Sequence, residues 1–304
     1  MAQTMVITGA GGQVGRFLAG ESGRRGYRVR ALTHRELDIT DPGAALRHIA
    51  AGDVVVNCAA LSNVDAAEND PDRAHAVNTA GPENLARACA EAGARLIHIS
   101  TDYVFGGGAF GGGAFGGGAH PPRPYEVDDA PDPLSVYGRT KLGGERAVLS
   151  ALPGAHVVRT SWVYTGDSGS DFVAVMRGLA ATDRTVDVVA DQIGSPTYVG
   201  DLVSALFEVI ERDVAPGILH VVNGGEASRF EQARAVFAEL GADPDRVRPV
   251  GTEDVPRPAR RPAYSALSMV DSARAGLTPL RPWRDALTEA LARSAGPGPL
   301  PSTP

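Results

Sequence analysis

Short apolar runs alternate along this chain with longer segments in which apolar residues recur every three or four positions. The short runs predict buried strands, and the longer segments predict amphipathic helices. Strands are expected at 4–9, 27–32, 53–60, 94–101, 155–162 and 217–224, and helices at 14–23, 71–93, 135–152, 170–181, 198–213, 228–241 and 282–294. Because strands that alternate with helices run parallel, the pattern predicts an α/β fold with a Rossmann-like, doubly wound parallel sheet.

Composition narrows the kinds of protein that fit this pattern. With 304 residues, 43% of them hydrophobic, the chain can bury a sizeable core. A net charge of −7 leaves no basic surplus to neutralise a phosphate backbone, so no nucleic-acid partner is expected. No apolar run reaches the roughly 18 residues of a membrane span, and no secretory signal pattern opens the chain. A cytoplasmic protein without a membrane partner is therefore expected.

A glycine-rich turn follows the first predicted strand, with Gly9, Gly12 and Gly15 spaced three apart in GAGGQVG. Glycines at such a turn let the backbone approach a pyrophosphate, which rests on the N–H groups that open the next helix. A turn between a strand and a helix is the context that dinucleotide binding requires. We expect Gly9, Gly12, Gln13, Val14 and Gly15 to hold a dinucleotide, and a merely tight turn is the alternative.

The choice of cofactor is expected to depend on the residues after the second strand. An acidic side chain there binds a ribose diol, and a basic one accommodates a 2′-phosphate. The chain continues with His34 and Arg35, which favours NADPH over NADH, although both side chains also fit a solvated surface. Asp38 and Ile39 are expected to border the adenine.

Tyr137 and Lys141 are four residues apart in a predicted helix, so their side chains lie on one face. A nearby ammonium favours phenolate and would lower the pKa of the tyrosine from about 10, which suits a general acid. Alone, this spacing also fits an exposed helical pair. Thr101 ends the fourth predicted strand at the edge where open α/β sheets bind ligands, and its hydroxyl can hydrogen-bond a substrate oxygen.

In order along the chain, these and other segments resemble a known family. The segments are GAGGQVG, LDIT, VVVNCAA, VNTAGPENLA, STDYVF, YGRTKLGGE, VVRTSWVY, DQIGSPT and RPARRPAYSAL. Together they resemble the extended short-chain dehydrogenase/reductase superfamily and, within it, the dTDP-4-dehydrorhamnose reductase family. The resemblance covers roughly residues 4–290.

The resemblance implies an NAD(P)H-dependent nucleotide-sugar 4-ketoreductase that converts dTDP-4-dehydro-6-deoxy-L-mannose to dTDP-L-rhamnose. The cofactor, NADPH or NADH, would supply a hydride to the C4 ketone. Tyr137 would protonate the developing alkoxide, Lys141 would hold the nicotinamide ribose and tune Tyr137, and Thr101 would stabilise the oxyanion. By the same resemblance, Ala59, Ala60, Leu61 and Ser62 line the cofactor, and Thr101, Asp102 and Trp162 meet the sugar.

A basic cluster in an otherwise acidic chain is a second candidate for substrate binding. Arg257 and Arg260 are predicted to bind the nucleotide phosphates, with Arg261 beside them and a solvated loop as the alternative. Trp162 offers a flat face for a sugar ring, yet a tryptophan after a buried strand also fits a core position. The seven histidines show no ligand spacing, so no metal site is predicted.

The motifs predict how the chain is divided. Residues 1–165 are expected to form mainly the dinucleotide-binding Rossmann domain. Residues 166–294 are expected to form mainly a smaller, mixed substrate-binding lobe, with strand returns to the sheet. Residues 295–304, rich in glycine and proline, predict a disordered tail.

Two features depart from the family's pattern. Some members dimerise through a magnesium ion bridged by glutamates, and Phe17 stands where one of these glutamates would align. A homodimer remains possible on this resemblance, but a metal bridge is not expected. A Phe/Gly/Ala repeat at 106–119 separates Thr101 from Tyr137. Its composition predicts a flexible loop, either a lid over the substrate or a neutral expansion.

Other functions remain open at this point. One alternative is a reductase that forms dTDP-dihydrostreptose in a streptomycin-type antibiotic pathway. Another is a different dTDP-6-deoxyhexose 4-ketoreductase, or an epimerase that uses the same tyrosine and lysine but retains its cofactor. A non-catalytic, dinucleotide-binding regulatory subunit belongs to a different class, and the intact Thr101, Tyr137 and Lys141 argue against it.

Overall fold

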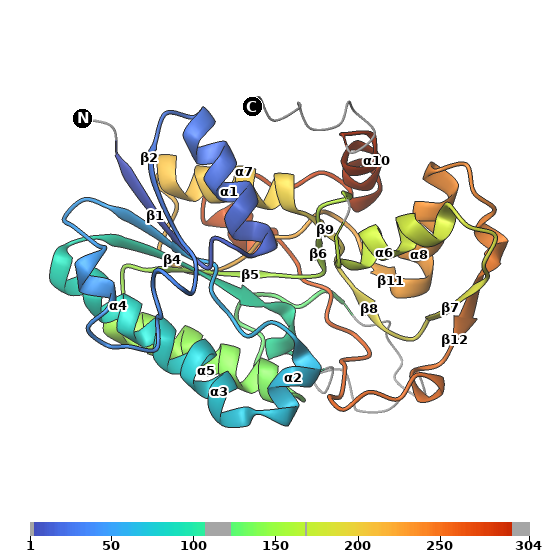
Figure 1. Cartoon of the computed structure of the whole chain (residues 1–304), viewed down its shortest axis with the longest axis horizontal. Coiled ribbons are helices and arrows are strands. Elements are labelled where there is room, and N and C mark those ends of the chain that lie inside the picture. The colour runs from blue at the N-terminus through green and yellow to red at the C-terminus, as the bar shows by residue number, and fades with distance from the viewer. Residues whose placement is uncertain (1–2, 107–122, 168, 294–304) are drawn as a thin grey trace, which may run out of the picture.

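A six-stranded sheet lies at the centre of the computed structural model, which describes residues 3–106, 123–167 and 169–293 (Figure 1). Its order is β10-β5-β4-β3-β1-β2, and every neighbouring pair runs parallel. The strands are β1 (Thr4–Thr8), β2 (Arg28–Leu32), β3 (Val54–Asn57), β4 (Arg95–Thr101), β5 (His156–Thr160) and β10 (Gly217–His220). Each predicted strand is therefore confirmed, and their carboxyl ends share one edge of the sheet.

Helices cover both faces of this sheet, as the doubly wound prediction requires (Figure 1). One face carries α1 (Gln13–Arg24) and α7 (Val199–Glu211), and the other carries α4 (Gly81–Ala92) and α5 (Val136–Ala151). The chain order reverses between β1 and β3, because β2 lies on one side of β1 and all later strands lie on the other. Open α/β sheets bind ligands beside such a reversal, at the carboxyl ends of the strands.

Successive residues of β1 enter two different cores. Met5 and Ile7 pack in the core that contains α1 and α7, while Val6 packs in the core beneath α4 and α5. All three side chains are fully buried. Strands that are covered on both faces need apolar residues at every position, which explains why they form unbroken apolar runs in the sequence.

The helix expected at 71–93 is divided into three parts. α3 (Pro71–His75) is followed by a π-helical segment, η2 (Ala76–Ala80), and then by α4. Pro82 has no N–H to donate to the carbonyl of Asn78, so the regular helical bond cannot form there. That carbonyl faces α5, where a Cβ on Gly144 would lie only 2.2 Å from it. The break thus permits a close contact between two chain segments.

The smaller lobe is built from helices and very short strands. α6 (Phe172–Ala180) packs against α8 (Arg229–Glu239), and α8 packs beside β7 (Val186–Val189), which pairs with β12 (Val247–Val250). β6 (Val163–Tyr164) pairs with β9 (Thr197–Tyr198), and β8 (Ile193–Gly194) pairs with β11 (Ala227–Ser228). Two-residue strands are too short for a visible period in the sequence. The other elements are α2 (Val64–Asn69), α9 (Val270–Arg274), α10 (Trp283–Arg293), η1 (Ala45–Arg47), η3 (Asp102–Val104), η5 (Pro244–Arg246) and η6 (Thr252–Asp254).

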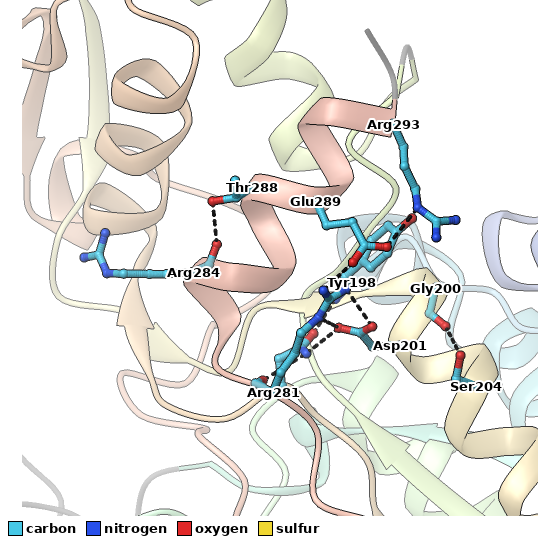
Figure 2. Close-up of polar contacts among 10 residues, drawn as sticks. Tyr198, Gly200, Asp201, Ser204, Arg281, Arg284, Thr288, Glu289 and Arg293 are labelled. Carbon is cyan, nitrogen blue, oxygen red and sulfur yellow. Dashed lines mark hydrogen bonds and ion pairs between the residues drawn. The ribbon is translucent and has the colours of Figure 1, made fainter. Parts of the chain in front are cut away.

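A polar network fastens α10 to the start of α7 (Figure 2). The Arg281 guanidinium donates two 2.9 Å hydrogen bonds to the carboxylate of Asp201 and also pairs with Glu289. Glu289 in turn pairs with Arg293 at 2.8 Å. Because Asn223, just after β10, donates to Asp201, the network reaches from the last helix back to the edge of the central sheet.

The structure addresses the predictions about membranes and metals only for the residues that it describes. Among the residues it describes, no helix is both long and apolar enough to cross a bilayer. The same residues contain no group of three or more His, Cys, Asp or Glu side chains placed to hold a metal ion. Most of the Phe/Gly/Ala repeat and the whole predicted tail at 295–304 lie outside the described residues.

Candidate active site

A cleft of about 910 Å³ runs along the carboxyl edge of the sheet, where β1, β2, β3, β4 and β5 end. Its lining draws on the glycine-rich turn, the residues after β2 and β3, the end of β4 and the first turns of α5. Of the predicted site residues, the cleft is lined by Gly9, Gly12, Gln13, Val14, Gly15, His34, Asp38, Ile39, Ala59, Ala60, Leu61, Ser62, Thr101, Asp102, Tyr137, Lys141 and Trp162. The tertiary structure therefore brings nearly the whole predicted set together.

The glycine-rich turn forms a cradle that larger residues would fill. Gly9 has a φ of 64°, and a Cβ there would lie 2.5 Å from the backbone nitrogen of Ala59. A Cβ on Gly15 would lie 2.6 Å from the carbonyl oxygen of Gly9. Both glycines are required sterically, and α1 begins between them at Gln13, with no side-chain hydrogen bond that caps its N-terminus. This geometry fits the pyrophosphate of a dinucleotide.

The residues after β2 do not all reach the cleft. His34 lines it, whereas Arg35 is exposed and does not line the described part of the cleft. Asp38 accepts hydrogen bonds from the backbone and hydroxyl of Thr40, and these bonds lower the pKa of its carboxyl. Arg73 of α3 also lines the cleft, a cation that the sequence analysis did not identify.

The loop after β3 is held in place by a buried amide. Leu61 donates its backbone N–H to Asn78 Oδ1 at 2.8 Å, and Asn78 Nδ2 donates back to the Leu61 carbonyl at 3.2 Å. Asn78 Nδ2 also lies 3.2 Å from the Thr140 hydroxyl on α5. Asn78 thus couples the cofactor side of the cleft to the helix that carries Tyr137. Asn78 belongs to VNTAGPENLA, one of the segments that carry the family resemblance, but the segment alone does not indicate this role.

Tyr137 occupies the first turn of α5, where the helix start is well defined. Ser135 caps this helix by accepting the N–H of Gly138 at 3.1 Å, and Glu68 of α2 accepts the N–H of Val136. A capped first turn holds its side chains in one orientation. Lys141 follows one turn later, and both residues line the cleft as their spacing predicts.

The phenol of Tyr137 remains protonated at neutral pH. Burial raises its pKa well above the ordinary value, and hydrogen bonding with Thr101 offsets only part of this shift. Thr101 itself accepts the N–H of Tyr103 at 3.1 Å, which fixes its hydroxyl at the end of β4. A protonated phenol next to a hydroxyl is suited to donating a proton to a developing alkoxide.

The predicted influence of Lys141 on that pKa is wrong for this structure. The Lys141 nitrogen donates to the carbonyl of Ile99 at 2.7 Å and lies 3.3 Å from His98 Nε2. The neighbouring groups that act on Tyr137 are instead the acids Asp102 and Tyr103, and both raise its pKa. Lys141 is itself fully enclosed, and burial lowers its own pKa to about 8.

Trp162 lines the cleft and has a constrained backbone conformation. Its φ is 47°, in the left-handed region that residues other than glycine rarely adopt. Such a backbone conformation costs energy and often occurs at functional sites. A Cβ on Gly194 would lie 2.5 Å from the indole, and the Arg229 guanidinium lies over the indole, 3.6 Å from the ring centroid. Arg229 was missed from the sequence, because it opens a predicted helix far from every motif.

The three arginines of the basic cluster at 257–261 differ in exposure: two face solvent and the third is largely buried. Arg257 and Arg260 are exposed and do not line the described part of the cleft. Arg261 binds the carboxylate of Asp65 through two hydrogen bonds of 2.7 and 3.0 Å, which lower the pKa of Asp65. The binding roles of Arg257 and Arg260 therefore stay predictions.

Known proteins with similar sequences indicate the family of this chain. A family model described as the RmlD substrate binding domain matches residues 3–295. The chain belongs to this family. It is 59% identical over 307 residues to a dTDP-4-dehydrorhamnose reductase of Mycolicibacterium smegmatis, covering 100% of this chain and 90% of the relative. It is 57% identical to the Mycobacterium tuberculosis enzyme of the same name, covering 97% and 94%.

Solved structures of the family share the fold. A dTDP-4-dehydrorhamnose reductase from Bacillus anthracis, determined in complex with NADP, superposes with a TM-score of 0.86. It is 34% identical, and the match covers 96% of this chain and 100% of that one. The predicted α/β, Rossmann-like fold and the family resemblance are therefore both confirmed.

Proposed function

We propose that this protein reduces the C4 ketone of dTDP-4-dehydro-6-deoxy-L-mannose to form dTDP-L-rhamnose. The observation that carries the proposal is that Thr101, Tyr137 and Lys141 line one cleft together with the glycine cradle. The printed names of the two mycobacterial relatives support the choice of substrate. Bound NADPH or NADH would supply the hydride.

Each residue has a separable task in this proposal. Gly9 and Gly15 leave room for the pyrophosphate, and Lys141 binds the nicotinamide ribose. Tyr137 donates its phenol proton to the oxygen at C4 as negative charge develops there. Thr101 donates a hydrogen bond to the same oxygen and lowers the energy of the charged transition state.

The sugar side of the cleft is proposed to lie between the end of β4 and Trp162. Asp102 and Trp162 line it, and Arg229 packs over the indole ring of Trp162. The division into a dinucleotide-binding part, residues 1–165, and a substrate-binding part, residues 166–294, belongs to the same proposal. A cytoplasmic location and a homodimer without a metal bridge stay predictions. Phe17 supports the latter, because it packs edge-on against Tyr198 instead of offering a metal ligand.

A product assay distinguishes the open alternatives. Purified protein is incubated with NADPH and dTDP-4-dehydro-6-deoxyglucose, with and without a 3,5-epimerase, and the product is identified by NMR. The proposal expects NADPH oxidation and dTDP-L-rhamnose only when the epimerase is present. A ring-contracted sugar indicates the dihydrostreptose reductase, and a product formed without the epimerase indicates another ketoreductase. Isomerisation without NADPH oxidation indicates an epimerase, and binding without turnover indicates a regulatory subunit.

A further inference from the structure

A chain of buried hydrogen bonds runs from the sheet to Lys141, directly behind the cleft. It joins Thr8 on β1, Asn57 on β3, His98 on β4 and Lys141 on α5. All four side chains are buried, and their exposed fractions do not exceed 2%. Of these four residues, only Lys141 has a role in the proposed reaction. Burying the polar side chains of Thr8, Asn57 and His98 is costly unless they are hydrogen-bonded, so their arrangement behind Lys141 calls for a physical reason.

The orientation of the Asn57 amide follows from its donors. Asn57 Oδ1 receives the backbone N–H of Ala59 at 3.1 Å and the Thr8 hydroxyl at 2.7 Å. A backbone N–H can only donate, so the atom that faces it is the amide oxygen. The amide NH₂ of Asn57 therefore points at His98 Nδ1, which lies 2.9 Å away.

This contact determines where the histidine carries its proton. An NH₂ group can only donate, so His98 Nδ1 must accept. Burial, together with the charge of Lys141, holds the pKa of His98 well below its ordinary value, so the ring is neutral. A neutral ring that accepts at Nδ1 carries its hydrogen on Nε2, the atom 3.3 Å from Lys141 Nζ.

We propose that His98 is a positioning residue that acts through Lys141: Asn57 keeps the histidine proton on Nε2, and His98 thereby offers the lysine nitrogen a donor and favours its neutral amine. An ammonium has no lone pair and would face this N–H with hydrogens of its own. The neutral amine can accept from His98 while it donates to the carbonyl of Ile99 at 2.7 Å. This proposal rests on the proposed role of Lys141 in the reductase.

The other groups around Lys141 do not replace this effect. Glu145, one turn further along α5, favours the ammonium and therefore acts in the opposite direction. Its carboxylate is already paired with Arg159 at 2.8 Å. Cys58, after β3, is an uncharged thiol at neutral pH because burial raises its pKa to about 12. Burial lowers the pKa of Lys141 to about 8, and the histidine N–H acts in the same direction.

The sequence offers an unusually direct test, since Lys141 is the only lysine among 29 basic residues. Protein labelled with ¹³C,¹⁵N-lysine gives one side-chain ammonium signal, whose NMR titration reports the pKa of Lys141 without any turnover. Labelled histidine reports the tautomer of His98, which is assigned by its loss in His98→Phe. We expect an Nε2–H tautomer in the wild type and an upward shift of the Lys141 titration by about one pH unit in His98→Phe.

Two further variants keep the test decisive. Asn57→Asp is nearly isosteric and keeps the bonds from Thr8 and Ala59, but its carboxylate can only accept, so His98 must carry its hydrogen on Nδ1 and donate it in a hydrogen bond. We expect this reversal to turn Nε2 into an acceptor and to move the Lys141 titration upward as well. The control is His156→Phe, which removes another buried histidine of the sheet whose Nε2 bonds only the Val214 carbonyl among its described partners. It should leave the Lys141 titration in place.

Kinetics separate this inference from the proposed function. The high-pH limb of kcat/KM for the reductase reaction should move with the lysine titration in His98→Phe and Asn57→Asp, and not in His156→Phe. An Nδ1–H tautomer in the wild type, or an unchanged Lys141 titration in the two variants, overturns the inference even if the enzyme reduces its substrate. A shifted titration without reductase activity overturns the proposed function instead.

Discussion

The hydroxyl of Ser265 donates a 2.6 Å hydrogen bond to Asp102 Oδ2 and joins the end of β4 to a segment 163 residues later in the chain. Asp102 is almost completely buried beside the cleft. Burial raises the pKa of its carboxyl to about 6, although the hydroxyls of Ser265 and Thr101 partly offset the shift. The burial of this carboxyl therefore couples the stability of the fold to pH.

Asp102→Asn should remove one component of the pH dependence of stability. The folded pKa of Asp102 is above its unfolded value of 3.8, so the native state binds more protons between pH 4 and 6. Stability from this group is complete below pH 4 and is lost as the pH rises to 6, by up to about 3 kcal/mol. Urea unfolding at pH 4, 5, 6 and 7 should show a fall in the wild type that the variant lacks. Parallel curves for the two proteins would contradict the assignment.

Tyr137→Phe should abolish most turnover and leave cofactor binding nearly intact. The phenol proton is needed only as the alkoxide forms, so its loss should lower kcat by about 10²-fold to 10⁴-fold. Steady-state kinetics and a fluorescence titration with NADPH measure the two effects separately. A variant that keeps a near-native rate would show that another group is the acid. Tyr103→Phe, on the neighbouring ring at 5.9 Å, is a matched control that keeps Tyr137.

Lys141→Met should weaken both turnover and cofactor binding, because its nitrogen is proposed to bind the nicotinamide ribose and so to hold the nicotinamide in place for the hydride transfer. The affinity for NADPH should fall by about tenfold or more, as expected when a hydrogen bond is lost and its partner is left buried and unpaired. Isothermal titration with NADPH measures this directly. Unchanged cofactor affinity together with low turnover would restrict Lys141 to the chemical step.

Cofactor preference should depend on His34 more than on Arg35, because only the former lines the described part of the cleft. The wild type should use NADPH at least as well as NADH. His34→Asp should shift the ratio of the two kcat/KM values toward NADH by about tenfold, since a carboxylate binds a ribose diol and repels a 2′-phosphate. Arg35→Asp is the matched comparison and should shift the ratio less. A strong preference of the wild type for NADH would reject this interpretation of the residues after β2.

A buried ion pair beneath the active site predicts a non-additive loss of stability. Arg159 and Glu145 meet at 2.8 Å with side chains that are each 2% exposed, and Ser100 donates to the same carboxylate. Arg159→Met leaves the carboxylate unpaired and should lower the free energy of unfolding by about 3–5 kcal/mol. The double variant Arg159→Met, Glu145→Gln should be more stable than Arg159→Met alone. Equal or lower stability of the double variant, measured by chemical denaturation, would contradict this.

Local patterns in the sequence determined much of the fold and most of the cleft. Strands buried on both faces need unbroken apolar runs, so β1 and β3 could be predicted from TMVIT and VVVN alone. Gly9 and Gly15 were identifiable because only glycine fits the turn that they form. Tyr137 and Lys141 were identifiable because four-residue spacing on a helix places both on one face. Each of these requirements acts between near neighbours in the chain.

The tertiary structure alone decided the features that depend on distant contacts. Arg229 packs on Trp162, and Ser265 donates to Asp102, across separations that leave no periodic signal in the sequence. The direction of the Tyr137 pKa shift was predicted wrongly, because burial depends on everything that surrounds the phenol and outweighs a cation on the same helix. The proton position on His98 is decided in the same way, by an amide on a neighbouring strand whose own orientation is set by a backbone N–H.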